Sequence, residues 1–262
     1  MKQGIYLAVF LAGALALPGF KKGGHYWITE KHDGYTLIFT PADSNNRYEY
    51  NLLIEKGILS VKKFFSDSFK KEFNVVIHPD RHSIDSTWQR DWNMPGFHSE
   101  CWMVASGIAS KLDMISPRMW STESCEHNAS DTLQTQRLIT HELVHVFHGQ
   151  INASPDFSNT ENIDWFVEGL AAYASGQMDA ARLTEVKKAI ADNNVPATLD
   201  DFWKGKLKYG LSGSVVLFID KKYGRQKLQQ LLPFTKKNEI LSALRVSETG
   251  LLNEWKEYMQ RW

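Results

Sequence analysis

The strongest structural signal in this chain is a pair of histidines in the segment His141-Glu142-Leu143-Val144-His145. Apolar residues at helical spacing surround the segment and predict a helix that begins at Ser130 or Asp131. Residues i and i+4 share one face of a helix, so both imidazoles can reach the same metal ion. Glu142 lies about 100° around the helix from His141 and can reach a metal-bound water without being a ligand. This spacing is typical of a zinc site.

A catalytic zinc ion usually has three protein ligands and an open position for water, so a third ligand is needed. One known arrangement places a histidine six residues after the second one, and Ile151 at that position excludes it. His148 lies nearly two helical turns from His141, and one straight helix cannot place three ligands around one ion. We interpret His148 as a helix-end residue or as a hydrogen-bond partner of a ligand.

Glu168 is the better candidate for the third ligand. It belongs to a second predicted helix, which begins between Asn162 and Asp164 and runs to Gly176. If this helix lies antiparallel to the first, its carboxylate approaches the two histidines. The flanking residues are apolar, so Glu168 would be costly to bury unless it were paired or bound a metal ion.

Together, His141–His145 and the stretch Trp165-Phe166-Val167-Glu168-Gly169-Leu170-Ala171 closely resemble the gluzincins, specifically the exported peptidase-MA-like zinc metallopeptidases. The resemblance covers about residues 130–225 and is weak in the N-terminal part. It implies a zincin-like fold with the active site between two lobes. It also implies Zn²⁺ as cofactor, held by the two histidines and Glu168, with Glu142 as general base.

The same resemblance extends to Tyr209 and the small-residue stretch that follows it, and it implies that this tyrosine donates a hydrogen bond to the oxyanion. One departure concerns the residue that orients a zinc-bound histidine. Thermolysin-like enzymes carry an aspartate four residues after the ligand glutamate, and here that position is Ala172. The orienting group must therefore come from elsewhere, and Asp164 and Glu161 are candidates because they are near in sequence.

The apolar pattern predicts an α+β fold, with a mixed α/β sheet lobe at residues 20–130 and a helical lobe at residues 131–262. No linker-like stretch separates the lobes, so we expect a single domain over residues 20–262. The elements expected in the sheet lobe are strands at Tyr35–Thr40 and Phe73–His78, a helix at Leu52–Glu72, and one or two strands within Trp102–Ile115. Further helices are expected at Arg182–Asp192, Ser212–Lys222 and Leu251–Trp262.

The N-terminus resembles a secretory signal peptide, which we place at residues 1–19. Lys2 precedes an apolar run, Ile5–Leu17, that is shorter than the roughly 20 residues of a membrane-spanning helix. Ala14-Leu15-Ala16 offers a cleavage site. We therefore expect an exported protein, periplasmic or secreted, without stable membrane insertion after cleavage. An uncleaved N-terminal anchor is the alternative.

Cys101 and Cys125 are the only cysteines, and export would allow them to form an intramolecular disulfide. Two free buried thiols are the alternative. The chain has 30 basic and 30 acidic residues, and this balance argues against a nucleic-acid partner. No pattern indicates an oligomeric state.

These observations predict a zinc-dependent metallopeptidase that hydrolyses peptide bonds of a peptide or protein substrate. No clear acidic motif for a substrate's free amine is present, which favours an endopeptidase. The alternative is a catalytically silent zinc- or peptide-binding protein on a peptidase scaffold. The aromatic residues before the histidine pair either line a substrate cleft or belong to the core. They are Trp88, Trp92, Phe97, Trp102 and Trp120.

Overall fold

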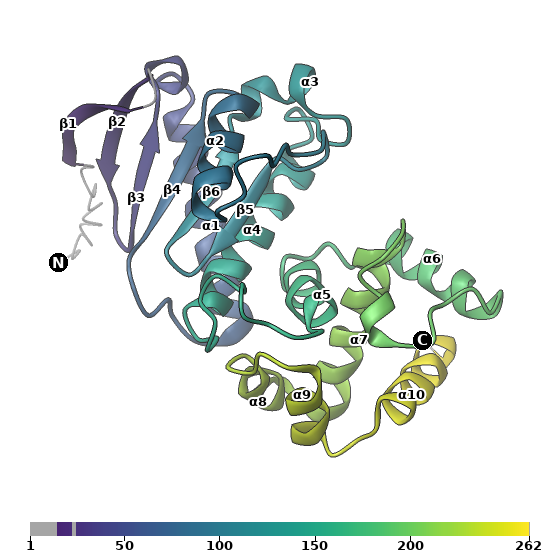
Figure 1. Cartoon of the computed structure of the whole chain (residues 1–262). Coiled ribbons are helices and arrows are strands. Elements are labelled where there is room, and N and C mark those ends of the chain that lie inside the picture. Colours follow the sequence, from purple (N-terminus) through teal and green to yellow (C-terminus); the bar gives the residue numbers. More distant parts are fainter. Residues whose placement is uncertain (1–14, 23–24, 262) are drawn as a thin grey trace, which may run out of the picture.

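The N-terminal half is built on one mixed six-stranded sheet (Figure 1). The computed structural model describes residues 15–22 and 25–261. The strand order is β1-β2-β3-β4-β6-β5, in which β3, β4 and β6 run parallel and the other neighbours pair antiparallel. The strands are β1 Leu15–Lys22, β2 His25–Lys31, β3 Tyr35–Phe39, β4 Phe73–His78, β5 Ala105–Ile108 and β6 Lys111–Ile115. Strand β5 is therefore one edge of the sheet.

Side chains of the parallel strands alternate between the two faces of the sheet, and most of the apolar ones lie in the core. In β4, Val75 is fully buried and lies opposite Leu37 of β3 and Leu112 of β6, which are equally buried. Asn74, the neighbour of Val75, points to the other face and is exposed. Pro79 follows directly after β4. The expected strand Phe73–His78 is thus confirmed residue for residue.

Helices cover both faces of the sheet and make up the C-terminal half. The α-helices of the described residues are α1 Arg47–Phe65, α2 Arg81–Asp91, α3 Trp120–Glu123, α4 Thr132–Gly149, α5 Asp164–Ala174, α6 Ala180–Ala191, α7 Lys208–Tyr223, α8 Arg225–Leu231, α9 Lys237–Leu244 and α10 Glu248–Arg261. Short 3₁₀ turns occupy Pro41–Asp43, Pro117–Met119 and Leu199–Asp201. The expected α+β class is confirmed.

Two close helix contacts position the C-terminal half. Helix α4 packs between the sheet edge and α5, and α5 in turn packs along α7 (Figure 1). The α5–α7 contact is tight because Gly169 faces the backbone of Ser212, where a side chain at residue 169 would clash. Aromatic rings also join the two halves, since Phe64 of α1 meets Tyr173 of α5 edge to face. This packing ties α4 and α5 to a common core.

One expected helix has different bounds. We expected a helix over Leu52–Glu72, and α1 instead spans Arg47–Phe65. Ser66 ends it with a left-handed backbone (φ 50°), a conformation that stops a helix. Phe69, which continued the apolar pattern, packs from the following loop against Phe147 of α4. The apolar pattern therefore predicted correctly that Phe69 packs against the core, although the helix ends before this residue.

Residues 1–14 of the expected signal peptide lie outside the described residues, and its last five residues belong to β1. Within the described part of the chain, no helix combines the length and apolar character needed to cross a bilayer. Cys101 and Cys125 form a disulfide that links the loop before β5 to the segment after α3. The Arg81 guanidinium reinforces this loop by donating to the carbonyls of Glu100 (3.0 Å) and Met103 (2.9 Å).

Candidate metal centre

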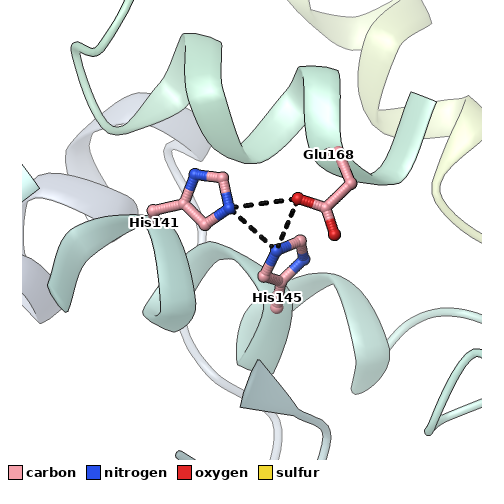
Figure 2. Close-up of side chains that lie close together, drawn as sticks. All are labelled: His141, His145 and Glu168. Carbon is pink, nitrogen blue, oxygen red and sulfur yellow. Dashed lines mark hydrogen bonds and ion pairs between the residues drawn. The ribbon is translucent and has the colours of Figure 1, made fainter. Parts of the chain in front are cut away.

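Helix α4 carries the histidine pair into the interior. It begins at the predicted cap, where the Asp131 carboxylate accepts a hydrogen bond from the Gln134 backbone N–H (3.0 Å). His141, Glu142 and His145 are all buried, with at most 6 % of their surface exposed. Glu168 projects from α5 toward the same point (Figure 2). The structure thus brings together the three residues expected to hold zinc.

Three ligand atoms converge within this cluster (Figure 2). The Nε2 atoms of His141 and His145 lie 3.1 Å apart, and Glu168 Oε2 lies 3.3 Å from the first and 3.5 Å from the second. Ligand atoms about 2.0–2.1 Å from a tetrahedral zinc ion are separated by about 3.3–3.4 Å. The triangle therefore has the size of one face of a zinc coordination tetrahedron, and these residues fit the ion.

Gln177 orients one of the histidines. Its side-chain oxygen Oε1 accepts a hydrogen bond from Nδ1 of His141 (3.1 Å), which leaves the Nε2 lone pair free to bind a metal. The orienting group is thus a neutral amide in the loop after α5. The sequence indicates Asp164 and Glu161 as candidates for this position because both are near Glu168. Glu161 instead lies 3.3 Å from Lys236, and Asp164 lines the cleft near Glu168.

His148 has a structural role. It is fully buried, and its Nε2 hydrogen-bonds to the carbonyl oxygen of Leu232 (3.1 Å) in the segment after α8. Burial lowers the pKa of His148 to about 3, so the ring is neutral at physiological pH. Asn152 donates to the same carbonyl (2.7 Å). His148 therefore anchors the end of α4 and lies outside the ligand cluster.

Glu142 lies against the edge strand β5. Its carboxylate is buried, and burial raises its pKa, with a smaller contribution from the charge of Glu168. Gly107 of β5 comes so close that a side chain there would overlap the carbonyl oxygen of Glu142. The Gly107 backbone N–H also hydrogen-bonds to the Glu142 carboxylate. A glycine in the edge strand thus allows direct contact between the sheet and this part of α4.

Tyr209 lies on the other side of the histidine pair, at the start of α7. Its ring packs edge to face on His141, with 5.9 Å between the ring centroids. Burial raises the pKa of its hydroxyl, and the charges of Glu168 and Glu142 raise it further. The phenol therefore stays protonated and can donate a hydrogen bond into the site.

All five residues line a single cleft of about 780 Å³. Strand β5 forms part of one wall, and residues of α4, α5, α6, α7 and several loops form the others. The aromatic residues expected near the site divide between two places. Trp92 and Trp102 line the cleft, while Trp88 and Trp120 are buried in the core and the half-buried Phe97 packs against that core.

The sequence matches the family model of the peptidase MA superfamily over residues 128–261, which includes every residue of this cluster. The chain belongs to the peptidase MA superfamily. The family that the two motifs indicated is therefore confirmed. No curated protein matches the sequence of this superfamily member.

Solved structures extend the similarity beyond the matched region. The yeast LTA4 hydrolase structure matches 90 % of this superfamily member with a TM-score of 0.50 at 13 % identity. An M1 zinc metallopeptidase from Deinococcus radiodurans matches 93 % with a TM-score of 0.47 at 14 % identity. The chain spans 38 % and 51 % of the length of these two proteins. This chain thus shares a fold with part of the yeast LTA4 hydrolase.

Proposed function

We propose that this protein is an exported zinc-dependent metallopeptidase. The convergence of two imidazole nitrogens and one carboxylate oxygen in a large cleft carries the proposal. Three ligands from two helices leave a fourth coordination position for water or substrate, which distinguishes catalytic from structural zinc sites. The two cysteines form a disulfide away from the cluster, so they are not zinc ligands.

Each cleft residue has a distinct role in this proposal. Bound zinc would polarise the scissile carbonyl and lower the pKa of a water molecule toward 7. Glu142 accepts the proton of the attacking water and passes it to the leaving amine. Tyr209 donates a hydrogen bond to the oxyanion, a contribution that is typically worth about 100- to 1000-fold in rate.

The position of β5 supports a peptide as substrate. An edge strand has unpaired backbone groups on one side, and an extended peptide can add to it as a further strand. Strand β5 pairs with β6 on one side and lines the cleft with Ala105, Ser106, Gly107 and Ile108. A substrate backbone bound here would pass directly over Glu142, which Gly107 contacts.

Export is the second element of the proposal. The Cys101–Cys125 disulfide supports it, since disulfides persist in oxidising compartments. The N-terminal sequence supports it as well, through the basic and apolar pattern of a signal peptide. Detection of the mature protein outside the cytoplasm, with a new N-terminus near residue 19, tests this element.

The activity is tested with a diverse peptide library and mass spectrometry of the new termini. Wild type, Glu142→Gln and the exposed α10 control Glu257→Gln are compared at equal zinc content. We expect cleavage by wild type and the control, loss with chelator, and a decrease of about 100- to 10,000-fold in Glu142→Gln. Near-normal cleavage by Glu142→Gln would contradict the role of Glu142. No cleavage by zinc-loaded wild type would favour the silent binding scaffold.

A further inference from the structure

Arg182 of α6 has an unusual environment in the cleft wall. Its guanidinium nitrogen Nη1 is buried and has no hydrogen-bond partner within the described residues. The side-chain stem packs over Gly210 of α7, where an added Cβ would lie 3.3 Å from Arg182 Cγ. Its Cζ lies 5.8 Å from the ring centroid of Tyr209. A buried charged donor without an acceptor destabilises the folded protein, so a bound group that accepts from this nitrogen would relieve the penalty.

The charge of Asp179 acts on Arg182, but this carboxylate forms its ion pair with another residue. Arg137, which lines the same cleft, forms an ion pair with Asp179 (2.9 Å). Asp179 also caps α6 by accepting from the Arg182 backbone N–H (3.1 Å). Within residues 15–22 and 25–261, Arg182 itself forms no ion pair with any carboxylate. Glu126 and Glu185 line the cleft but are exposed to solvent.

A second cation, Lys208, lies against aromatic residues of this end of the cleft, although it does not itself line the cleft. Lys208 Nζ lies 4.1 Å from the ring centroid of Trp102 and 4.6 Å from that of Trp203. Its only described partners are aromatic rings, so its charge is not balanced by a carboxylate. Arg182 lies next to Tyr209, which itself packs on His141. Lys208 Nζ also lies 5.3 Å from the ring centroid of Tyr209, so this tyrosine connects both cations to the predicted metal ligand His141.

The direction of β5 indicates which part of a substrate reaches this end. Gly107 lies over Glu142 and His145, and Ala109 lies against Gly149, so β5 and α4 advance in the same direction. Residues before β5, including Trp102, thus lie toward the start of α4. A peptide paired antiparallel to β5 runs the opposite way. Its C-terminal part would therefore point toward Arg182.

We propose that Arg182 binds a substrate carboxylate on the C-terminal side of the scissile bond. This inference rests on the proposed function, because it places a peptide along β5. A carboxylate supplies the acceptor that Nη1 lacks, in a charge-assisted hydrogen bond. The carboxylate has two sources, the free C-terminus of a short peptide or the side chain of Asp or Glu. Arg182 is thus a residue that determines substrate specificity.

The test measures binding, which does not require turnover. Zinc-loaded Glu142→Gln is incubated with randomised N-acetyl tetrapeptides, prepared with either a free C-terminal carboxylate or a C-terminal amide. Peptides retained after gel filtration are quantified by mass spectrometry. The same selection uses Glu142→Gln combined with Arg182→Gln, and combined with Arg261→Gln as an exposed arginine control on α10. Zinc content and melting temperature verify that each variant is folded.

We expect carboxylate peptides to be retained about 10- to 100-fold better than amides, the effect of one hydrogen bond to a charged group. Arg182→Gln should reduce this ratio to about one, and Arg261→Gln should not change it. Enrichment of Asp or Glu within the amide library would identify a side chain as the source. Equal retention of both libraries without enrichment of Asp or Glu, including retention of neither, would overturn the assignment. A preference for carboxylates that survives Arg182→Gln would overturn it as well. Because wild-type turnover is measured separately, failure of this inference is distinguishable from failure of the proposed function.

Discussion

The helical half of the molecule buries His141 and His145 beside Glu168, and the sheet half buries His78 beside Asp113. In the sheet, each ring nitrogen of His78 has its own partner. Nδ1 lies 3.0 Å from Ser83 Oγ, and Nε2 lies 3.0 Å from Asp113 Oδ1. In the helical half, two Nε2 atoms face one another and share the same oxygen of Glu168.

This difference separates a structural cluster from a candidate metal centre. The His78 network alternates donors and acceptors, and Lys111 completes it with an ion pair to Asp113. Asp113 thus has two basic partners within the described residues, His78 and Lys111. In the other cluster, three atoms that are all acceptors in their metal-binding forms point at one position. A shared cation would stabilise such convergence, and under the proposed function the adjacent cleft would give that cation access to substrate.

Removal of a predicted zinc ligand should produce the largest effect, a loss of zinc affinity in the cluster of His141, His145 and Glu168. Glu168→Ala deletes one corner of the triangle, so we expect zinc affinity to fall by more than the 10- to 100-fold typical of outer hydrogen-bond partners. Metal analysis after dialysis against a zinc buffer measures this. Asp164→Ala, which removes another cleft carboxylate from α5, is the matched control and should retain zinc. Unchanged affinity in Glu168→Ala would remove this residue from the ligand set.

A smaller effect is expected from the residue that orients His141. Gln177→Ala removes the acceptor that fixes the ring tautomer, and zinc affinity should fall by about 10- to 100-fold. Competition with a chromophoric chelator measures the change. Gln177→Glu restores an acceptor and should recover most of the affinity. If Gln177→Ala bound zinc as tightly as wild type, the hydrogen bond to Nδ1 would have no orienting role.

The smallest effect concerns the pH dependence of the sheet cluster. Burial raises the pKa of Asp113, but His78 and Lys111 outweigh it and hold that pKa below its ordinary value. The unfolded chain therefore takes up this proton first as the pH falls. The resulting stability is present above about pH 4 and is lost as the pH falls through the lowered pKa, by at most about 1.4 kcal/mol per pH unit.

Chemical denaturation of the metal-free protein between pH 2 and pH 7 measures this dependence. Asp113→Asn cannot titrate, so its free energy of unfolding should change less steeply with pH below pH 4. An identical slope in the two proteins would show that Asp113 does not contribute to acid sensitivity. Such a result would weaken the interpretation of the His78 cluster as a closed ionic network.

Local sequence patterns were sufficient to predict a site residue where a single helix determines the position of its side chain. The spacing of His141 and His145 placed both imidazoles on one face, and Asp131 marked the start of their helix. Glu168 could be selected because a carboxylate among apolar residues needs a partner. These inferences required only helical geometry and the cost of burying charge.

Helix α2 and the orienting role of Gln177 depend on tertiary contacts, so no local sequence pattern predicts them. Helix α2 was not expected because only Ile84 and Trp88 supply its apolar face in an otherwise polar segment. Gln177 follows Gly176, whose positive φ of 78° turns the chain back after α5. The residues after such a turn follow no helical or strand pattern, so the sequence does not predict which residues the Gln177 side chain contacts. Ala172, which replaces the usual aspartate, was the only signal that another orienting group was required.

Anomalous diffraction at the zinc edge, from crystals of protein purified without chelator, tests the metal assignment most directly. We expect one strong peak per chain, about 2.0–2.2 Å from Nε2 of His141, Nε2 of His145 and a carboxylate oxygen of Glu168. The cluster around His78 should show no peak. A peak at another site, or none in protein soaked with zinc, would contradict the proposal that this convergent cluster is a catalytic metal centre.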